Sequence, residues 1–404
     1  MSAAARVTRR TLLIGAAASA VVVPRPTAAT GRATGAPARE ETYQAVVVGS
    51  GFGGSVAALR LAQAGVRTLV LERGRWWNSH PDDNTFPRFY HPDHRVSWLE
   101  PTPVMPTSPP AVFRPYTGLV ERIRGVGISI LAGTGVGGGS LHYAGISLQP
   151  SEELFTRVMP STVDYREMAS VYYPRVAAML RYSPVPDDIL DHERYTSSRT
   201  FLADAARAGG APVRLPQPMD WDVVRAELRG ELPPWSAHGD VLYGVNNGAR
   251  HSTDKTYLTQ AVATGLVTIA PLHVVKDLTA GTTRRYSLRC ERIDTDGTVL
   301  ENITVSNDAL FLAAGSANTS RLLVRAHGKG TLPHLPPDVG RYWGNNGDRV
   351  YLHTELPPIT RGGCYLDRVG DAGMVVGSAW AARQAASYSS GLSQPRSFWM
   401  RSVL

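Results

Sequence analysis

The chain has 404 residues, of which 43% are hydrophobic and 19% charged, and its formal net charge is +8 at pH 7. This composition excludes a disordered chain, and the length predicts two domains with a sizeable core. Half of the net charge lies in residues 1–42, and no later basic segment is interleaved with aromatic residues. The charge pattern therefore argues against a nucleic-acid partner.

Residues 1–42 have the pattern of an export signal followed by a linker. Arg9 and Arg10 precede an apolar stretch that ends at residue 23, and a proline and small residues follow. This order is typical of a secretory signal, and the arginine pair indicates the twin-arginine route. The apolar core is too short for a membrane span. We expect a protein secreted by the twin-arginine pathway, with a linker at 31–42; a disordered basic tail is the alternative.

The segment after the linker carries the motif on which the interpretation depends. Residues 46–48 predict a buried strand, and Gly49, Gly51 and Gly54 follow in the G-x-G-x-x-G spacing. The first glycine permits a tight turn, the second lets the backbone approach a pyrophosphate, and the third allows a helix and a strand to pack closely. Residues 55–64 predict the helix whose N-terminus attracts the phosphates.

A second predicted strand, residues 68–71, ends at Glu72. An acidic residue at this distance from the glycine motif is placed to accept hydrogen bonds from a ribose hydroxyl. Strand, helix, strand and acid together predict dinucleotide binding. A glycine-rich turn in an ordinary α/β domain is the alternative.

Residues 76–116 are rich in tryptophan, phenylalanine, tyrosine and proline and follow neither a helical nor a strand period. Long irregular segments of this kind in compact proteins are lids, binding loops or disordered segments, and the aromatic content argues against disorder. We expect an apolar lid over a substrate cavity. An insertion that only packs on the surface is the alternative.

A second glycine cluster includes Gly125 and Gly127 and continues through residues 133–145. Because side chains are almost absent here, a flat ring or a phosphate could lie directly on the backbone. A flexible linker is the alternative.

Further along the chain, helices and strands alternate. We expect helical structure over residues 151–182 and a mixed segment up to residue 240, both in a second domain. The other expected elements are a short helix from 254, a strand at 267–269 that continues through 272–276, strands at 286–293 and 303–305 around a turn at 296–297, a buried strand from 309, and a helix at 318–326.

Together these stretches resemble the glucose-methanol-choline (GMC) oxidoreductases, and within them the bacterial cholesterol oxidase type with non-covalent FAD. The resemblance covers residues 43–350 in order. It is carried by residues 48–54, 71–72, 135–141, 243–248, 254–258, 272–276, 312–316 and 322–326.

The resemblance implies an α/β fold with a Rossmann-like FAD-binding domain and a second, α+β substrate-binding domain. Beside the three motif glycines, it implies that Phe52 and Gly53 contact the FAD pyrophosphate. Glu72 would bind the adenosine ribose, and the Val275 backbone would meet the adenine.

On the flavin side, the resemblance implies contacts from Gly139, Tyr143, Ala144 and Ile146. Cholesterol oxidases carry Asn, Gly and Met where this chain has Tyr143, Ala144 and Ile146. This departure leaves the cofactor unchanged but weakens the assignment of a steroid substrate.

The activity that the resemblance implies is the FAD-dependent oxidation of a sterol-type secondary alcohol. Hydride passes to the flavin and then to O2, which gives hydrogen peroxide. The implied partners are a hydrophobic, sterol-like small molecule, O2 and a transient contact with a membrane surface. The alternatives are a GMC-type dehydrogenase that acts on another hydrophobic alcohol, and a catalytically inactive flavin- or sterol-binding protein.

The chain departs from the family pattern near its C-terminus. The family's catalytic His and Asn lie there in His-Pro-Leu-Gly-Gly and Asn-Pro segments, and neither segment occurs in this sequence. The catalytic residues are therefore unknown, and an incomplete chain without activity is an alternative to the active oxidase. Residues 361–404 have no sustained period, which suggests a truncated or frame-shifted end.

Cys290 and Cys364 lack the spacing of metal ligands. They could form one disulfide, but buried or incidental thiols are the favoured interpretation, and no metal site is predicted. The expected organisation is signal and linker (1–42), three parts of the FAD-binding domain (43–75, 117–150 and 241–330), the lid (76–116), the substrate domain (151–240) and its return with the irregular tail (331–404).

Overall fold

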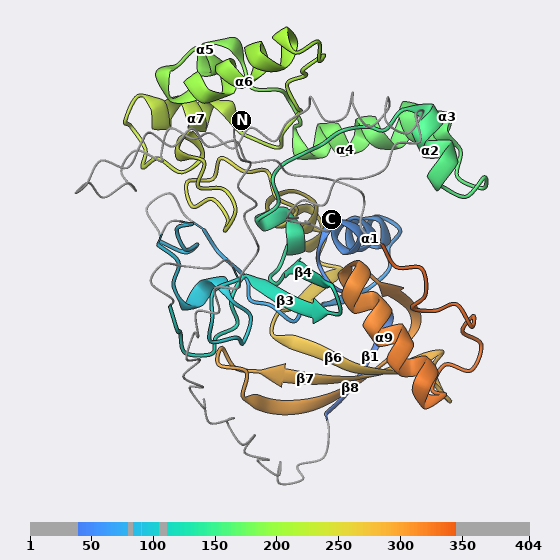
Figure 1. The fold of residues 1–404 in the computed structure, drawn as a ribbon. Coiled ribbons are helices and arrows are strands. Elements are labelled where there is room, and N and C mark those ends of the chain that lie inside the picture. Colours follow the sequence, from blue (N-terminus) through green and yellow to red (C-terminus); the bar gives the residue numbers. More distant parts are fainter. Residues whose placement is uncertain (1–38, 80–83, 90, 105–110, 345–404) are drawn as a thin grey trace, which may run out of the picture. The chain divides into compact units, whose positions relative to one another are not determined.

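The computed structural model describes residues 39–79, 84–89, 91–104 and 111–344 (Figure 1). The predicted export signal, most of the linker and the irregular tail lie outside these residues. Within the described part of the chain, no helix is both long and apolar enough to cross a membrane.

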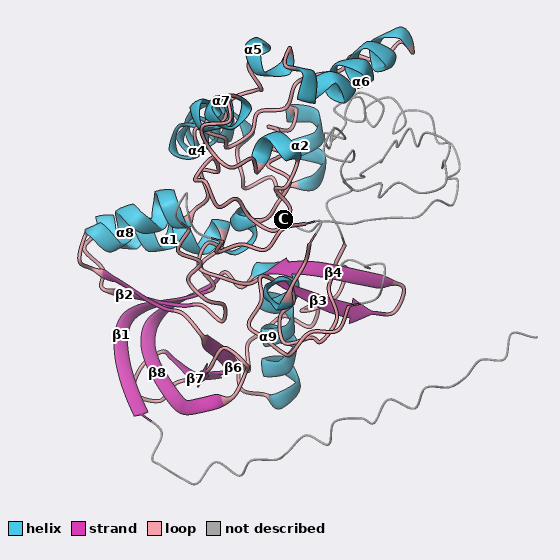
Figure 2. Ribbon diagram, turned by 90° about the vertical axis from the view of Figure 1, so that its left-hand side faces the viewer, coloured by secondary structure: helices cyan, strands magenta, loops and turns pink. Residues whose placement is uncertain are grey.

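The larger sheet of the described residues has six strands and lies below the helices α2, α4, α5, α6 and α7 in Figure 2. Its order is β5-β2-β1-β8-β7-β6; the first four strands are parallel, and β7 and β6 are antiparallel to their neighbours. This topology confirms the α/β class and the Rossmann-like core. The strands are β1 (Arg39–Val48), β2 (Thr68–Leu71), β5 (Val267–Ala270), β6 (His273–Ala280), β7 (Tyr286–Ile293) and β8 (Val299–Leu312).

Both faces of the central strands are covered. Val47 packs in one apolar cluster with residues of α1 (Phe52–Gln63) and α8 (Thr259–Ala263). Its neighbours Val46 and Val48 pack in a second cluster that includes residues of α9 (Gly315–Lys329). Strands that are buried on both faces have continuous apolar sequences, which is why residues 46–48 could be predicted as a strand.

Three strand predictions need correction. β1 begins at Arg39, inside the predicted linker, because its first half pairs with β8 from Ile303 onward. The two predicted strands at 303–305 and from 309 are one strand, β8, whose polar middle pairs with neighbours on both sides. β6 does not continue β5: the two strands lie at opposite edges of the sheet, and the chain turns at Leu272, whose φ is +58°.

A two-stranded hairpin of β3 (Val120–Gly125) and β4 (Ile128–Gly133) precedes the short helix η2 (Gly138–Leu141). The first glycines of the second cluster form the turn of this hairpin, where Val126 is fully exposed. Gly125 and Gly127 were predicted to support a ring or a phosphate. This prediction is wrong, because both glycines are exposed to solvent at the turn between β3 and β4.

Residues 151–240 are helical, and the strands of the predicted α+β domain do not occur among them. Ser183 and Gln217 form an isolated β-bridge, and an apolar cluster around Val224 and Trp235 holds this part together. The helices are α2 (Glu152–Val158), α3 (Tyr165–Glu167), η3 (Met168–Tyr172), α4 (Tyr173–Leu180), α5 (Asp187–Leu190), η4 (Glu193–Tyr195), α6 (Thr196–Arg207), α7 (Trp221–Leu228) and η5 (Ser236–His238), followed by η6 (Asp254–Leu258) before α8.

The described residues of the predicted lid form a packed segment with one short helix, η1 (His94–Val96). Trp77 and Phe86 are each 3% exposed and stack with ring centroids 5.7 Å apart. They pack against Leu119 at the start of the hairpin and against Tyr243. The alternative, a packed insertion, therefore describes these residues better than a lid.

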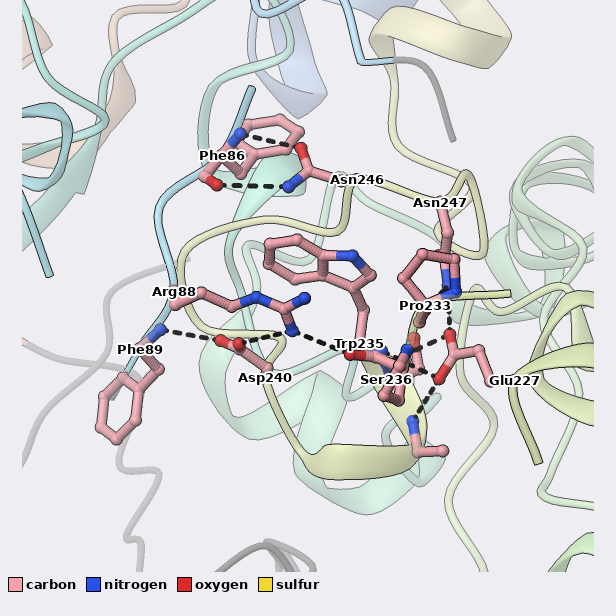
Figure 3. Close-up of polar contacts among 12 residues, drawn as sticks. Phe86, Arg88, Phe89, Glu227, Pro233, Trp235, Ser236, Asp240, Asn246 and Asn247 are labelled. Atoms are coloured by element: carbon pink, nitrogen blue, oxygen red, sulfur yellow. Dashed lines mark hydrogen bonds and ion pairs between the residues drawn. The ribbon is translucent and has the colours of Figure 1, made fainter. Parts of the chain in front are cut away.

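Polar contacts also hold this segment in place (Figure 3). The Phe86 N–H donates to Asn246 Oδ1 at 2.8 Å, and the Phe89 N–H donates to Asp240 Oδ1 at 2.8 Å. Arg88 pairs with Asp240 at 3.2 Å, and its guanidinium lies 3.4 Å from the centre of the Trp235 ring.

The predicted buried thiol at Cys290 is confirmed. The side chain is free, lies in β7 with no exposed surface, and burial raises the pKa of its thiol to about 12. Cys364 lies outside the described residues.

Candidate functional site

A cavity of about 780 Å³ opens where β1, β2 and β8 end. Its wall includes Val48 at the end of β1, Gly49 directly after it, Glu72 after β2, and Ala313 after β8. Ligands of open α/β sheets bind at the carboxyl ends of the strands, and the volume is in the range of cofactor sites.

Two positions of the glycine motif after β1 do not tolerate a side chain. Gly49 has φ +96°, and a Cβ there would lie 2.4 Å from the Ala313 carbonyl oxygen. A Cβ on Gly54 would lie 1.9 Å from the Gly49 carbonyl oxygen. At Gly53, by contrast, a Cβ would meet no protein atom within 4 Å, although the residue lines the cavity. The backbone is therefore open toward the cavity at this position.

Glu72 holds the glycine turn from the end of β2. Its Oε2 accepts hydrogen bonds from the Ser50 N–H at 3.0 Å and the Ser50 hydroxyl at 2.7 Å, and its Oε1 accepts from the Gly74 N–H at 2.9 Å. The carboxylate is 5% exposed and lines the cavity. Because each carboxylate oxygen has two lone pairs, Oε1 retains one acceptor site for a ligand hydroxyl.

Ser50 joins the two glycine clusters, which sequence analysis did not foresee. Its buried Oγ accepts a hydrogen bond from the Gly137 N–H at 3.1 Å. Next to it, a Cβ on Gly138 would lie 2.7 Å from the Gly51 Cα. The two loops therefore meet backbone against backbone and form a cavity wall that is almost free of side chains.

The N-terminus of α1 faces this wall. Its first residue, Phe52, lines the cavity, and the N-cap Gly51 supplies no side-chain cap. The first turn also carries no acidic residue. Uncapped N–H groups and the positive end of the helix dipole form an anion site, so these residues fit the pyrophosphate of a dinucleotide.

A charged cluster lies on another part of the cavity wall. Arg73 forms an ion pair with Glu121, which also accepts hydrogen bonds from Asn318 and Arg321, each at 3.2 Å. Burial opposes ionisation of Glu121, but Arg73, with Asn318 and Arg321, lowers the pKa of its carboxyl below the usual value. Trp98 lies over Arg73, with 5.3 Å between the guanidinium carbon and the ring centre. Sequence analysis missed this cluster because its members lie far apart in the chain.

The predicted flavin-side residues follow η2. Gly139 lines the large cavity, and the ring of Tyr143 meets the ring of Phe52 edge to face at 5.2 Å. Burial raises the pKa of the Tyr143 hydroxyl above its ordinary value. Ala144 and Ile146 line a second, smaller cavity instead.

Of the eleven predicted cofactor-binding residues, seven therefore line the large cavity: Gly49, Gly51, Phe52, Gly53, Glu72, Gly139 and Val275. Gly54 lies in the first turn of α1, where it permits the close packing of the helix against the glycine turn. Tyr143 reaches the cavity wall through its contact with Phe52, whereas Ala144 and Ile146 lie elsewhere. Contact with a cofactor remains a prediction for all eleven.

Comparison with known proteins agrees with this geometry: the chain matches the GMC oxidoreductase family over residues 43–343. It belongs to this family. It is 28% identical over 327 residues to a cholesterol oxidase of Mycobacterium tuberculosis (strain ATCC 25618 / H37Rv), with 76% of this chain and 52% of that protein covered. A cholesterol oxidase of Acinetobacter baumannii is 24% identical, with 76% of this chain and 55% of that protein covered.

The long-chain-alcohol oxidase FAO4B of Arabidopsis thaliana is 25% identical, with 74% of this chain and 35% of that protein covered. Among solved structures, pyridoxine 4-oxidase from Mesorbium loti gives a TM-score of 0.41 at 16% identity and covers 70% of this chain and 51% of its own. This GMC oxidoreductase chain spans about half the length of the two cholesterol oxidases that it matches.

The GMC family consists of flavoproteins, and the large cavity lies at the carboxyl ends of the strands, where open α/β sheets bind their ligands. Within the described residues, no group of three or more His, Cys, Asp or Glu side chains could hold a metal ion. The large cavity of this GMC oxidoreductase combines glycine backbone, the buried Glu72 carboxylate and the charged cluster around Glu121.

Proposed function

We propose that this chain binds FAD in the large cavity. The observation that carries the proposal is the contact between the two glycine clusters beside the open N-terminus of α1. The pyrophosphate is assigned to the backbone at Gly51 and Gly53, the adenosine ribose to Glu72, and the adenine to the backbone of Val275. Gly139 and Tyr143 lie beside Phe52 and are assigned to the flavin side; for Ala144 and Ile146 the assignment rests on the family resemblance alone.

We further propose that the protein oxidises a hydrophobic secondary alcohol of the sterol type, with O2 as electron acceptor. Bound FAD would supply the hydride acceptor. The chain's own residues hold the dinucleotide, and Trp98 of the packed segment forms part of the cavity wall. Support for a hydrophobic alcohol comes from the relatives, two of which are named for cholesterol and one for long-chain alcohols.

A second candidate is a GMC dehydrogenase for another hydrophobic alcohol. Tyr143, Ala144 and Ile146 depart from the cholesterol oxidase pattern, and the match to a long-chain-alcohol oxidase favours a different alcohol. Because the chain spans about half of the cholesterol oxidases that it matches, the catalytic base is not assigned to any described residue. An inactive flavin-binding chain is the third outcome that the experiment must separate.

The test begins with purified protein reconstituted with FAD and desalted. We expect a yellow protein with one FAD per chain and a flavin absorbance spectrum. Peroxide release with cholesterol supports the oxidase; flavin bleaching by an alcohol without peroxide favours the dehydrogenase; bound flavin without turnover identifies an inactive binder. Folded protein that takes up no FAD overturns the proposal.

We also propose export through the twin-arginine pathway, since this route carries folded proteins and would allow FAD to bind before transport. Replacement of Arg9 and Arg10 by lysine should keep the protein in the cytoplasm, as cell fractionation would show. Unchanged export of the variant would contradict the proposal. We also propose a transient contact with a membrane surface. Co-sedimentation of the protein with cholesterol-containing vesicles would measure it.

A further inference from the structure

A second cavity, of about 160 Å³, lies between the segment that follows η2 and the helical residues 185–241. Among the described residues, none lines both this cavity and the large one. Most of its wall is apolar, and a water molecule needs only about 10–15 Å³ of such volume. The cavity therefore has room for a small organic molecule. Its apolar side chains include Ile146, Leu190, Leu202, Leu215, Met219 and Trp221.

A buried cation forms part of this wall. Arg250 is 3% exposed; its Nη1 donates to the Tyr143 carbonyl oxygen, and its Nη2 donates to the Val241 carbonyl oxygen at 3.2 Å. The guanidinium carbon lies 5.5 Å from the centre of the Tyr143 ring. Its Nε is buried and has no hydrogen-bond partner among the described residues. Burial lowers the pKa of Arg250 to about 10, so the side chain stays charged at neutral pH.

No described residue of the cavity wall supplies a carboxylate to pair with Arg250. Arg194 and Arg214 also line the cavity, whereas the described wall residues include no aspartate or glutamate. Arg214 is already paired with Asp187 at 2.6 Å, outside the cavity wall. A buried charge without a counter-ion is costly, so an anion that reached Arg250 would gain a strong interaction.

Arg250 and Ser236 both line the cavity, and Arg250 Nε and Ser236 Oγ are buried atoms without a partner in the described structure. The carboxylate of Glu227 does not reach the wall. It accepts hydrogen bonds from the N–H groups of Trp235, Ser236 and Ala237 at 3.1, 3.2 and 2.7 Å (Figure 3).

From these observations we infer that the second cavity binds the carboxylate of a small apolar carboxylic acid. The carboxylate accepts hydrogen bonds from Arg250 and Ser236, and the hydrocarbon chain lies on the apolar wall. A planar carboxylate matches a guanidinium edge, and one anionic group suits a wall with few donors better than a phosphate does. Ala144 and Ile146, assigned to the flavin side from the family resemblance alone, line this cavity. The inference itself uses Arg250, Ser236 and the apolar wall, so a chain that takes up no FAD would not overturn it.

Calorimetric titration of the purified full chain with hexanoate tests the site. We expect hexanoate to bind one per chain, and the neutral isostere hexanamide to bind at least tenfold more weakly. Arg250→Met should lower the affinity for hexanoate at least tenfold, because a charge-assisted hydrogen bond is lost. Arg229→Met is the matched control: Arg229 is exposed and paired with Glu231 at 2.7 Å, so hexanoate affinity should stay at the wild-type value.

Because Arg250 also holds two carbonyl groups, circular dichroism must show that Arg250→Met is folded. Ser236→Ala removes one hydroxyl and provides a second variant, for which we expect hexanoate to bind about three- to tenfold more weakly. The inference is overturned if hexanoate gives no binding heat, if hexanamide binds as tightly, if inorganic phosphate binds more tightly than hexanoate, or if folded variants at both positions retain the wild-type affinity.

Discussion

Gly53 and Gly54 are neighbours in the first turn of α1, yet their surroundings are opposite. A methyl group on Gly54 would collide with the Gly49 carbonyl, whereas one on Gly53 would project into the large cavity. We expect Gly54→Ala to lower the free energy of unfolding by more than about 2 kcal/mol, because backbone must move. Gly53→Ala should leave the flavin-free protein within about 0.5 kcal/mol of wild type.

The same pair tests the pyrophosphate assignment. The methyl group of Gly53→Ala would occupy space assigned to the phosphates. The variant should therefore bind FAD at least about tenfold more weakly, which is a loss of about 1.4 kcal/mol in binding free energy. Urea unfolding without flavin and a fluorescence titration with FAD supply the two measurements. A Gly53→Ala protein with wild-type FAD affinity would place the pyrophosphate elsewhere.

His142 gives a prediction for pH dependence. Its Nε2 is buried without a partner among the described residues, and burial, together with Arg250, lowers the pKa of the imidazole to about 4. Between pH 6.5 and 4 the unfolded chain therefore binds a proton that the folded chain does not. The free energy of unfolding should fall as the pH drops through this window, by at most about 3 kcal/mol.

His142→Gln removes this titration and should flatten the pH dependence of urea unfolding between pH 6.5 and 4. His327→Gln, at an exposed position on α9, is the control and should keep the wild-type slope. Equal slopes for wild type and His142→Gln would show that His142 is not the group that titrates.

At the scale of elements, the packed segment is held by Asp240, whose side chain is 3% exposed. Asp240→Asn keeps an oxygen for the Phe89 N–H but loses the charge opposite Arg88. Because Arg88 is partly exposed, we expect the free energy of unfolding to fall by about 1–2 kcal/mol. Amide hydrogen exchange at residues 86–89 should become faster. Asp204→Asn removes an exposed pair within one helical turn and should change neither quantity.

If exchange at residues 86–89 is as slow in Asp240→Asn as in wild type, the ion pair does not fasten the segment. The apolar cluster around Trp77 and Phe86 would then be sufficient to hold it.

Elements with a strong local signal were predicted well. β2 and β7 have the predicted bounds, because their apolar patterns are continuous or alternate regularly. β8 was divided in two because Ser306, Asn307 and Asp308 interrupt its apolar pattern. Pairing with strands on both sides overrides this local signal, and pairing cannot be read from a single sequence.

For the whole molecule, the motif glycines and Glu72 could be placed at the site from their spacing, because a β-strand, a tight turn and a helix have fixed geometry. Ser50, Glu121 and Arg250 could not. Each acts through partners that lie far away in the sequence: Ser50 contacts Gly137, Glu121 contacts Arg321, and Arg250 contacts Tyr143. These contacts depend on the completed fold and leave no local pattern.

The walls of the large cavity come from segments that only the folded chain brings together: residues 48–53, 71–73, 130–139, 273–276 and 312–325. FAD should therefore bind the folded state and not the unfolded chain, so binding must stabilise the protein. At a free concentration one hundred times the dissociation constant, the free energy of unfolding should rise by about 2.7 kcal/mol. Urea unfolding at increasing FAD concentrations measures this increase.

Unfolding measurements with ADP and with adenosine, two fragments of FAD, would show which part of the cavity provides the stabilisation. Because the diphosphate is assigned to the N-terminus of α1, ADP should stabilise the protein more than adenosine does at the same concentration. Gly53→Ala should reduce the effect of ADP and leave that of adenosine unchanged. Equal stabilisation by ADP and adenosine would mean that the glycine turn does not bind the phosphates, even if the protein is yellow.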